Sequence, residues 1–138
     1  MEMDVAAHRK WVESELRQSL RALAAPADIQ VVTFAPFVCV TCELLEDYEN
    51  FRRAARSLGL LTQLPMTLHP IDLAISQLTS ADTACDQPER LRTSSRWAEV
   101  RRAAIASLTT LGWSYAIPAA DVPLGDGTWG RRLESEPQ

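Results

Sequence analysis

The sequence predicts an all-α protein of four main helices, with an extended connector before the second helix and an irregular C-terminal tail packed on the bundle. Apolar side chains recur at three- and four-residue intervals in four segments, which is the repeat of a helix with one buried face. None of these segments contains a glycine, because the five glycines stand at Gly59, Gly112 and within residues 125–130. Glycine at such positions is typical of helix ends and turns.

The first helix is predicted over residues 5–24, with Asp4 as its N-cap. Pro26 ends it, because proline restricts the backbone of the residue before it. Residues 29–34 are rich in β-branched side chains and predict a short extended segment. The apolar stripe of the helix over residues 5–24 consists of Val5, Val12, Leu16, Leu20 and Leu23.

The second helix is predicted over residues 42–58 and has the clearest amphipathic pattern in the chain. Thr41 is its expected N-cap and Gly59 its expected C-terminal stop. Acidic residues occupy its first half and arginines its second half, which matches the helix dipole. The apolar stripe consists of Leu44, Leu45, Tyr48, Phe51, Ala55 and Leu58.

The third helix is predicted over residues 70–78, with Pro70 at its first position, where a missing N–H costs nothing. Residues 79–95 are polar and predict a surface loop, with one helical turn over residues 88–92. The fourth helix is predicted over residues 96–111, with Ser95 as N-cap. Gly112 ends it, and the next residue packs back over the last turn.

The chain is irregular after residue 114, and its apolar side chains predict a tail that packs along the helices as far as Trp129. We therefore expect a single helical domain over residues 1–130 and a flexible tail over residues 131–138. The predicted core consists of Val12, Leu16, Leu20, Phe37, Leu44, Tyr48, Phe51, Ile75, Leu78, Trp97, Val100, Ile105 and Leu108.

Composition excludes several classes of function. The chain has 138 residues, which suffices for one hydrophobic core, and a net charge of −4, which gives no general basis for nucleic-acid binding. No apolar run is long enough to cross a bilayer, and the N-terminus lacks the apolar stretch of a signal peptide. The predicted location is the cytoplasm, where the three cysteines are expected to remain thiols.

Cys39 and Cys42 form a Cys-x-x-Cys pair before the second helix. Two thiols at this spacing can form a reversible disulfide, and a helix N-terminus stabilises a thiolate. The segment VVTFAPFVCVTCELL resembles the active-site approach of thioredoxins, which implies Cys39 as the attacking thiol and Cys42 as the resolving thiol. Val38 and Val40 stand where thioredoxins carry Trp and Gly, and the strands of a thioredoxin sheet do not follow.

Other chemistry has weaker support. A zinc set of Cys39, Cys42, His69 and Cys85 is conceivable, but structural zinc sites usually show two compact pairs. Three small, mostly buried thiols are the simpler interpretation, so no metal or cofactor is predicted. The sequence lacks Gly-x-Ser-x-Gly, His-Glu-x-x-His and a phosphate-binding glycine loop, and neither His8 nor His69 has an evident orienting acid.

Arg96, Arg101 and Arg102 gather near the N-terminal half of the fourth helix, against the preference of the helix dipole. They are the candidate partner-binding residues. Pairing with the acidic half of the second helix is the favoured interpretation, and contact with an anionic partner is the alternative.

Two segments carry a second resemblance. FAPFVCVTCELLEDYENF (residues 34–51) and RWAEVRRAAIASLTTLGW (residues 96–113) are similar to small bacterial helical proteins with a Phe-x-x-Phe-Val-Cys segment and a final Trp-x-Glu-Val-Arg-Arg…Gly-Trp helix. That group has no assigned activity, so the resemblance implies a fold and not a function. It also implies a packing role for Cys39, because the second cysteine is not a regular feature of the group.

We therefore predict a small acidic cytosolic protein-binding domain without catalytic machinery, such as an immunity-type or antitoxin-type inhibitor or an adaptor. The expected partner is another protein, with no nucleic acid and no membrane. The alternative is a thiol–disulfide oxidoreductase that uses Cys39 and Cys42. A purely structural subunit is the third possibility.

Overall fold

The computed structural model describes residues 4–34, 36–60, 63–116, 121–125 and 127–131. Within these ranges the chain forms six helices and one two-stranded ribbon, so the all-α prediction is confirmed but the predicted set of four helices omits two short ones. The elements are α1 (Val5–Ala24), α2 (Ala27–Thr33), α3 (Val40–Ser57), α4 (Leu64–Ser76), α5 (Arg90–Thr93), α6 (Ser95–Leu111), β1 (Asp121–Pro123) and β2 (Trp129–Arg131).

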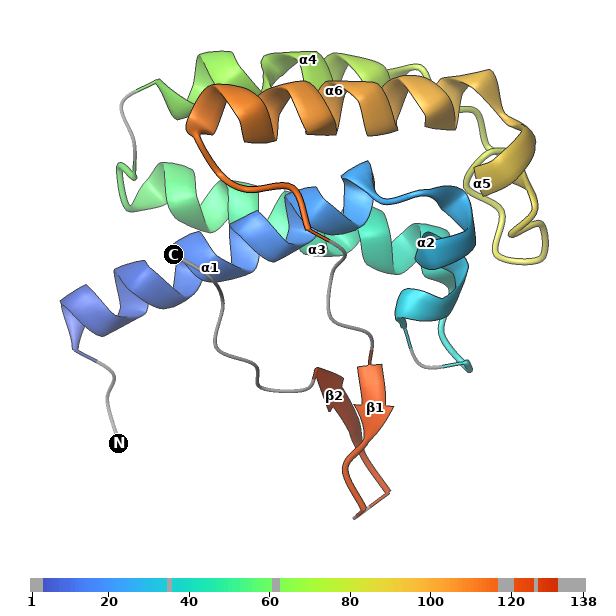
Figure 1. Cartoon of the computed structure of the whole chain (residues 1–138), viewed down its shortest axis with the longest axis horizontal. Coiled ribbons are helices and arrows are strands. Elements are labelled where there is room, and N and C mark those ends of the chain that lie inside the picture. The colour runs from blue at the N-terminus through green and yellow to red at the C-terminus, as the bar shows by residue number, and fades with distance from the viewer. Residues whose placement is uncertain (1–3, 35, 61–62, 117–120, 126, 132–138) are drawn as a thin grey trace.

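The four long helices alternate in direction along the chain (Figure 1). The antiparallel pair α1 and α3 forms one layer, and the antiparallel pair α4 and α6 lies over it. Helix α1 joins the layers because it contacts both α3 and α6. The short helices α2 and α5 contact each other at the end of the bundle where α3 and α6 begin.

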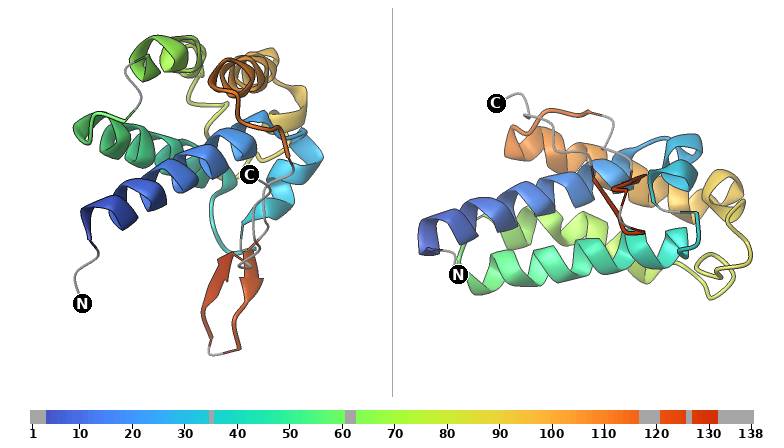
Figure 2. Two further views of the ribbon diagram at one scale, coloured as in Figure 1. Left: turned by 60° about the vertical axis from the view of Figure 1, so that its left-hand side comes forward. Right: turned by 90° about the horizontal axis from the view of Figure 1, so that it is seen from below.

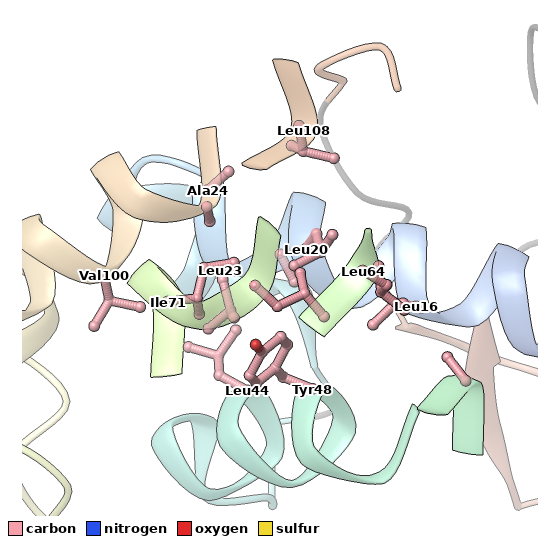
Figure 3. Packing of buried hydrophobic residues seen from close by; sticks show 14 of the residues in the cluster. Leu16, Leu20, Leu23, Ala24, Leu44, Tyr48, Leu64, Ile71, Val100 and Leu108 are labelled. Carbon is pink, nitrogen blue, oxygen red and sulfur yellow. The ribbon is translucent and has the colours of Figure 1, made fainter. Parts of the chain in front are cut away.

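Side chains from the four long helices meet in one hydrophobic cluster between the layers (Figure 3). Most of the predicted core residues belong to it, with Phe51, Ile75 and Leu78 partly buried at its edge. Two predictions are wrong, because Phe37 is 74% exposed and Ile105 is 43% exposed. Phe37 lies in the bend between α2 and α3, and Ile105 stands outside the narrower buried stripe of α6.

The predicted extended connector is wrong, because residues 27–33 form α2. The local β preference is overridden by Gln30, which is fully buried. Its side-chain amide donates hydrogen bonds to the carbonyls of Ala22 at 3.0 Å and Leu23 at 3.1 Å. Carbonyls in the last turn of a helix lack an amide from a following turn. The Ala22 carbonyl also accepts from the Ala25 amide at 3.4 Å, and Gln30 adds a bond to each of the two carbonyls, so α2 caps α1.

The third predicted helix begins too late. Helix α4 begins at Leu64, with Pro65 in its first turn, and Pro70 lies inside it. Pro70 removes the N–H that would bond to the carbonyl of Met66. Both residues are exposed, Met66 to 83%, so water can reach this side of the helix while Leu64, Leu68 and Ile71 face the core.

Three predicted helix ends are confirmed. The Asp4 side chain caps α1 by accepting a hydrogen bond from a first-turn amide. Gly59 and Gly112 follow α3 and α6 with φ angles of 65° and 71°, which an L side chain rarely adopts. After Gly112, the Trp113 amide donates to the carbonyl of Leu108 at 3.0 Å, which is the expected return over the last turn.

Two predicted N-caps are wrong. Cys39 is the N-cap residue of α3, and Thr41 is buried inside the first turn, where its hydroxyl donates to the carbonyl of Thr83. Ser94, one residue earlier than predicted, caps α6 by accepting from the amide of Arg96 at 3.2 Å.

The tail departs from the helices earlier than predicted. The Arg21 guanidinium donates to the carbonyl and hydroxyl of Ser114, and the Tyr115 hydroxyl donates to the carbonyl of Ala24. Strands β1 and β2 then form a hairpin that points away from the bundle (Figure 2), with Val122 opposite Gly130. The predicted contacts of residue 117 and the predicted flexible segment 132–138 lie outside the described residues.

Candidate functional site

All three cysteines of the chain meet at the beginning of α3. Cys39 is the N-cap residue of that helix, Cys42 lies in its first turn, and Cys85 comes from the loop between α4 and α5. The three sulfur atoms all lie within 4.8 Å of one another. Cys85 is exposed and the other two are half-buried, so the predicted set of mostly buried thiols is wrong.

Cys39 forms a disulfide with Cys85, 46 residues away, with a Cα–Cα distance of 5.1 Å. This corrects two predictions: the cysteines are not all thiols, and Cys39 is bonded to Cys85 and not to its Cys-x-x-Cys neighbour. Cys42 is free, and its Sγ lies 3.6 Å from the Sγ of Cys85. A free thiol is therefore next to one sulfur of an existing disulfide.

Asp82 holds the loop that carries Cys85. Its carboxylate is fully buried and accepts hydrogen bonds from the Thr79 amide at 2.9 Å, Arg90 at 2.8 Å and Arg96 at 2.8 Å. The Asp82 amide donates to the Thr79 hydroxyl, and the Asp82 carbonyl accepts from the indole of buried Trp97 at 2.8 Å. The loop is thus attached to α5 and α6 through one residue.

The charge of Asp82 is well compensated. Burial by itself would raise the pKa of this carboxyl, but the Thr79 amide and the Arg96 guanidinium outweigh burial and lower the pKa well below its ordinary value. Asp82 therefore stays ionised at neutral pH, and the two arginines remain attached to the loop.

A second tether joins the loop directly to α3. The Thr41 hydroxyl donates to the carbonyl of Thr83 at 3.0 Å, and the same hydroxyl oxygen lies 3.4 Å from the Sγ of Cys39. With the Asp82 contacts, this bond keeps the Cys85 loop over the start of α3 by links that do not involve sulfur. The three cysteines are therefore held together by more than the disulfide.

The three arginines predicted to bind a partner all make contacts within the chain. Arg96 pairs with Asp82, Arg101 donates to the carbonyl of Leu91 at 2.8 Å, and Arg102 pairs with Glu99. Burial, and then the charge of Arg102, lower the pKa of Arg101. Among the described ion pairs, none joins these arginines to the acidic half of α3, so that favoured interpretation is wrong.

Arg96 and Arg102 also line a groove of about 620 Å³ between α4 and α6. Its apolar lining includes Leu73, which is 56% exposed, together with Pro70 and Ala103. Arg101 is absent from this lining, so the groove brings together two of the three predicted residues.

His69 lies in α4 and is not part of the cysteine cluster. It lines a separate groove with Arg52 and Arg56 of α3. Among the described side chains that could bind a metal, the cluster within 4.8 Å consists of the three cysteines. The four-residue zinc set considered from the sequence is therefore not assembled. His8 stacks on Trp11 at the exposed end of α1, with ring centroids 6.1 Å apart.

A polar cluster between α3 and α4 borders a groove of about 560 Å³. The buried Tyr48 hydroxyl donates to Asp72 at 2.7 Å, and Arg52 pairs with both Glu49 and Asp72. Burial, followed by the hydrogen bond to Asp72, raises the pKa of Tyr48 far above its ordinary value. This phenol therefore keeps its proton, which suits a structural hydrogen bond and not a catalytic base.

The sequence interpretation missed Cys85 as the disulfide partner and Asp82 as the anchor of its loop. A local signal for Asp82 exists, because Thr79-x-x-Asp82 has the spacing at which two residues exchange side-chain and amide hydrogen bonds. No local signal marks Cys85, because its partner lies 46 residues earlier.

Comparison with protein-family models, curated proteins and solved structures found no match for this chain. The two resemblances seen in the sequence therefore stay predictions. Among the described helices, none has both the length and the apolar character needed to span a bilayer.

Proposed function

We propose that this protein carries out reversible thiol–disulfide exchange through its three cysteines. The observation that carries the proposal is the free thiol of Cys42, 3.6 Å from the Cys85 sulfur of the Cys39–Cys85 disulfide. Exchange requires a thiolate that can reach a disulfide sulfur, and both partners are present here. The proposed class is the oxidoreductase predicted as the alternative, with Cys85 as the sulfur that changes partners.

Cys85 is the exposed member of the cluster, so an incoming thiolate attacks its sulfur. A new bond forms between Cys85 and the substrate sulfur, the Cys39–Cys85 bond breaks, and Cys39 leaves as a thiolate that takes up a proton. A second substrate thiolate then attacks the substrate sulfur of this mixed disulfide and releases Cys85. The substrate dithiol is oxidised to a disulfide, and the protein disulfide is reduced.

Cys42 supplies a second route from the mixed disulfide. When no second substrate thiol is in reach, the Cys42 thiolate attacks Cys85, and the substrate leaves as a thiolate. A Cys42–Cys85 disulfide then remains, and Cys39 keeps its proton. This step removes a trapped substrate without any external oxidant.

Equilibration with glutathione buffers of graded potential tests this function. Acid quenching, alkylation and mass spectrometry give the oxidation state of each cysteine. We expect a reversible two-electron transition, and a Cys42→Ser variant that accumulates the glutathione mixed disulfide at Cys85. A disulfide that stays oxidised across the whole range, or equal amounts of mixed disulfide in both proteins, would contradict the proposal.

We propose protein binding as a second function, because the lining of the α4–α6 groove combines half-exposed Leu73 with the charged side chains of Arg96, Glu99 and Arg102. An amphipathic helix with one apolar stripe, flanked by charged side chains of both signs, matches this lining. The immunity-type or antitoxin-type inhibitor and the adaptor predicted from the sequence, both cytoplasmic, belong to this class. Affinity capture with wild type and Leu73→Glu tests it: one dominant protein should be recovered by wild type alone, and equal recovery by both would contradict it.

A further inference from the structure

We propose that the reduced protein binds one thiophilic cation, zinc or copper(I), through Cys39, Cys42 and Cys85. Thiolate sulfur is the donor that these two ions prefer in proteins. The inference rests on the reducible disulfide that the exchange function also requires. It goes beyond exchange because binding needs no substrate thiol and transfers no electrons.

The positions of the sulfur atoms suit a metal ion. Zinc–sulfur bonds of about 2.3 Å in a tetrahedral site place neighbouring sulfurs about 3.8 Å apart. Cys42 and Cys85 are already separated by 3.6 Å, and the whole cluster lies within 4.8 Å. After reduction the Cys39 and Cys85 sulfurs must move apart, which rotation of exposed Cys85 can supply.

The backbone that carries these side chains is held without the disulfide. Asp82 attaches the loop to α5 and α6, and Thr41 attaches it to α3. Reduction therefore breaks one link among several, and Cys85 stays over the start of α3. A site whose ligands are already positioned loses less entropy when it binds an ion.

Electrostatics also favour the thiolate–metal complex at this place. A complex of zinc with three thiolates has a net charge of −1. The N-terminus of the 18-residue helix α3 supplies partial positive charge beside Cys39 and Cys42, which stabilises this negative charge. Among the described His, Cys, Asp and Glu side chains, no fourth joins the cluster within 4.8 Å. Zinc bound here has a fourth position open to water or an added ligand, whereas copper(I) is satisfied by three sulfurs.

Metal titration of the full chain under anaerobic, reducing conditions tests the site. Cobalt(II) is the first probe, because thiolate ligands give it a near-ultraviolet charge-transfer band, and zinc should displace it at one ion per chain. A second arm uses copper(I) in competition with a chromogenic chelator. Binding of either ion at one per chain supports the site, and the two arms identify which ion it prefers.

Three variants sharpen the experiment. Cys42→Ser keeps the disulfide pair and Cys85→Ser removes it, yet each deletes a ligand. Each should weaken binding by at least about 100-fold, because loss of a group that only supports a ligand already costs about 10–100-fold. Ser80→Ala, in the same loop, keeps all three thiols and should bind as wild type does. Circular dichroism and a thiol titration verify that each reduced protein is helical and has its full number of thiols.

A folded chain with three free thiols that binds neither ion overturns this inference and leaves thiol–disulfide exchange standing. Full-strength binding by Cys42→Ser and Cys85→Ser overturns it as well, because the ion then lies elsewhere. A disulfide that cannot be reduced in the folded chain overturns both proposals.

Discussion

The Asp82 carboxylate accepts a hydrogen bond from the Arg96 guanidinium across 14 positions of sequence, with Oδ2 and Nε 2.8 Å apart. Asp82 is fully buried, and Arg96 lies in the first turn of α6. This contact, together with Arg90 on the other carboxylate oxygen, fixes the loop that carries Cys85. The chemistry of the cysteine cluster therefore depends on a charge that lies outside it.

Asp82→Asn should lower the free energy of unfolding by about 2–3 kcal/mol. Asparagine keeps one acceptor for the Thr79 amide but loses the charge that holds Arg90 and Arg96. The value is below that of a fully buried ion pair because Arg96 is partly exposed. Urea unfolding followed by circular dichroism measures it. Asp86→Asn is the matched control, because Asp86 is exposed in the same loop and its loss should cost under about 0.5 kcal/mol.

The lowered pKa of Asp82 predicts a specific loss of stability in acid. A carboxyl whose pKa is lower in the folded state stabilises the protein above the pKa of the unfolded chain, which is about 3.8 for aspartate. This contribution should be complete at neutral pH and decline as the pH falls below about 4. Asp82→Asn should show a shallower decline than wild type in unfolding measured from pH 6 to pH 2. Parallel curves for the two proteins would contradict this assignment.

Periodicity predicted the long helices because a stripe of buried side chains is a local property of the sequence. Helices α1, α3 and α6 have such stripes and begin within two residues of the predicted positions. The prediction of an extended backbone over residues 29–34 is wrong. It rests on the local preference of β-branched residues, whereas the carbonyls that Gln30 caps lie in another helix, α1. The start of α4 is predicted six residues too late because proline usually marks a helix boundary, whereas Pro70 lies on the exposed side of α4, where the missing hydrogen bond does not face the core.

The site was harder to predict than the fold. The Cys-x-x-Cys pair indicates the correct end of α3, but spacing within one segment cannot indicate a disulfide partner from another segment. Cys85 lies in a polar loop whose position is decided by Asp82 and Trp97, and both contacts join distant parts of the chain. The charge of Arg96 near the start of α6 marks it as a candidate residue in the sequence, but its ion-pair partner is Asp82 in this loop and not a residue of α3.

Gln30→Met should lower the free energy of unfolding by about 1–3 kcal/mol. Methionine has a similar volume but donates no hydrogen bond. The Leu23 carbonyl therefore loses its bond from Gln30, and the Ala22 carbonyl retains the 3.4 Å bond from the Ala25 amide. Thermal and urea unfolding measure the loss. Gln77→Met, at the exposed end of α4, supplies the matched control and should change stability by under about 0.5 kcal/mol. An equal effect at the two sites would mean that α2 does not cap α1.

Tyr48→Phe should cost about 1 kcal/mol at neutral pH, because it removes the hydrogen bond to Asp72 but retains the buried ring. The raised pKa of Tyr48 also sets the alkaline behaviour. A phenol whose pKa is higher in the folded state stabilises the protein fully below about pH 10 and loses this contribution as the pH rises further. Wild type should therefore lose more stability than Tyr48→Phe between pH 9 and pH 12. Curves that stay parallel across this range would place the titration elsewhere.

Exchange of partners at Cys85 can be tested by removing one cysteine at a time. The native disulfide closes a loop between residues 46 positions apart, and a crosslink of that length stabilises a protein by about 3–4 kcal/mol. Cys85→Ser should lose this stabilisation entirely. Cys39→Ser should recover most of it, because Cys42 lies 3.6 Å from Cys85 and closes a loop of nearly the same length.

Non-reducing peptide mapping and urea unfolding, each with and without reductant, measure both effects. The expected result is a Cys42–Cys85 crosslink in oxidised Cys39→Ser, and a stability that reductant lowers to that of Cys85→Ser. Cys42→Ser serves as the control, because it keeps the native disulfide and should match wild type within about 0.5 kcal/mol. If Cys39→Ser instead contains two free thiols under oxidising conditions, Cys42 cannot reach Cys85, and its role in exchange is excluded.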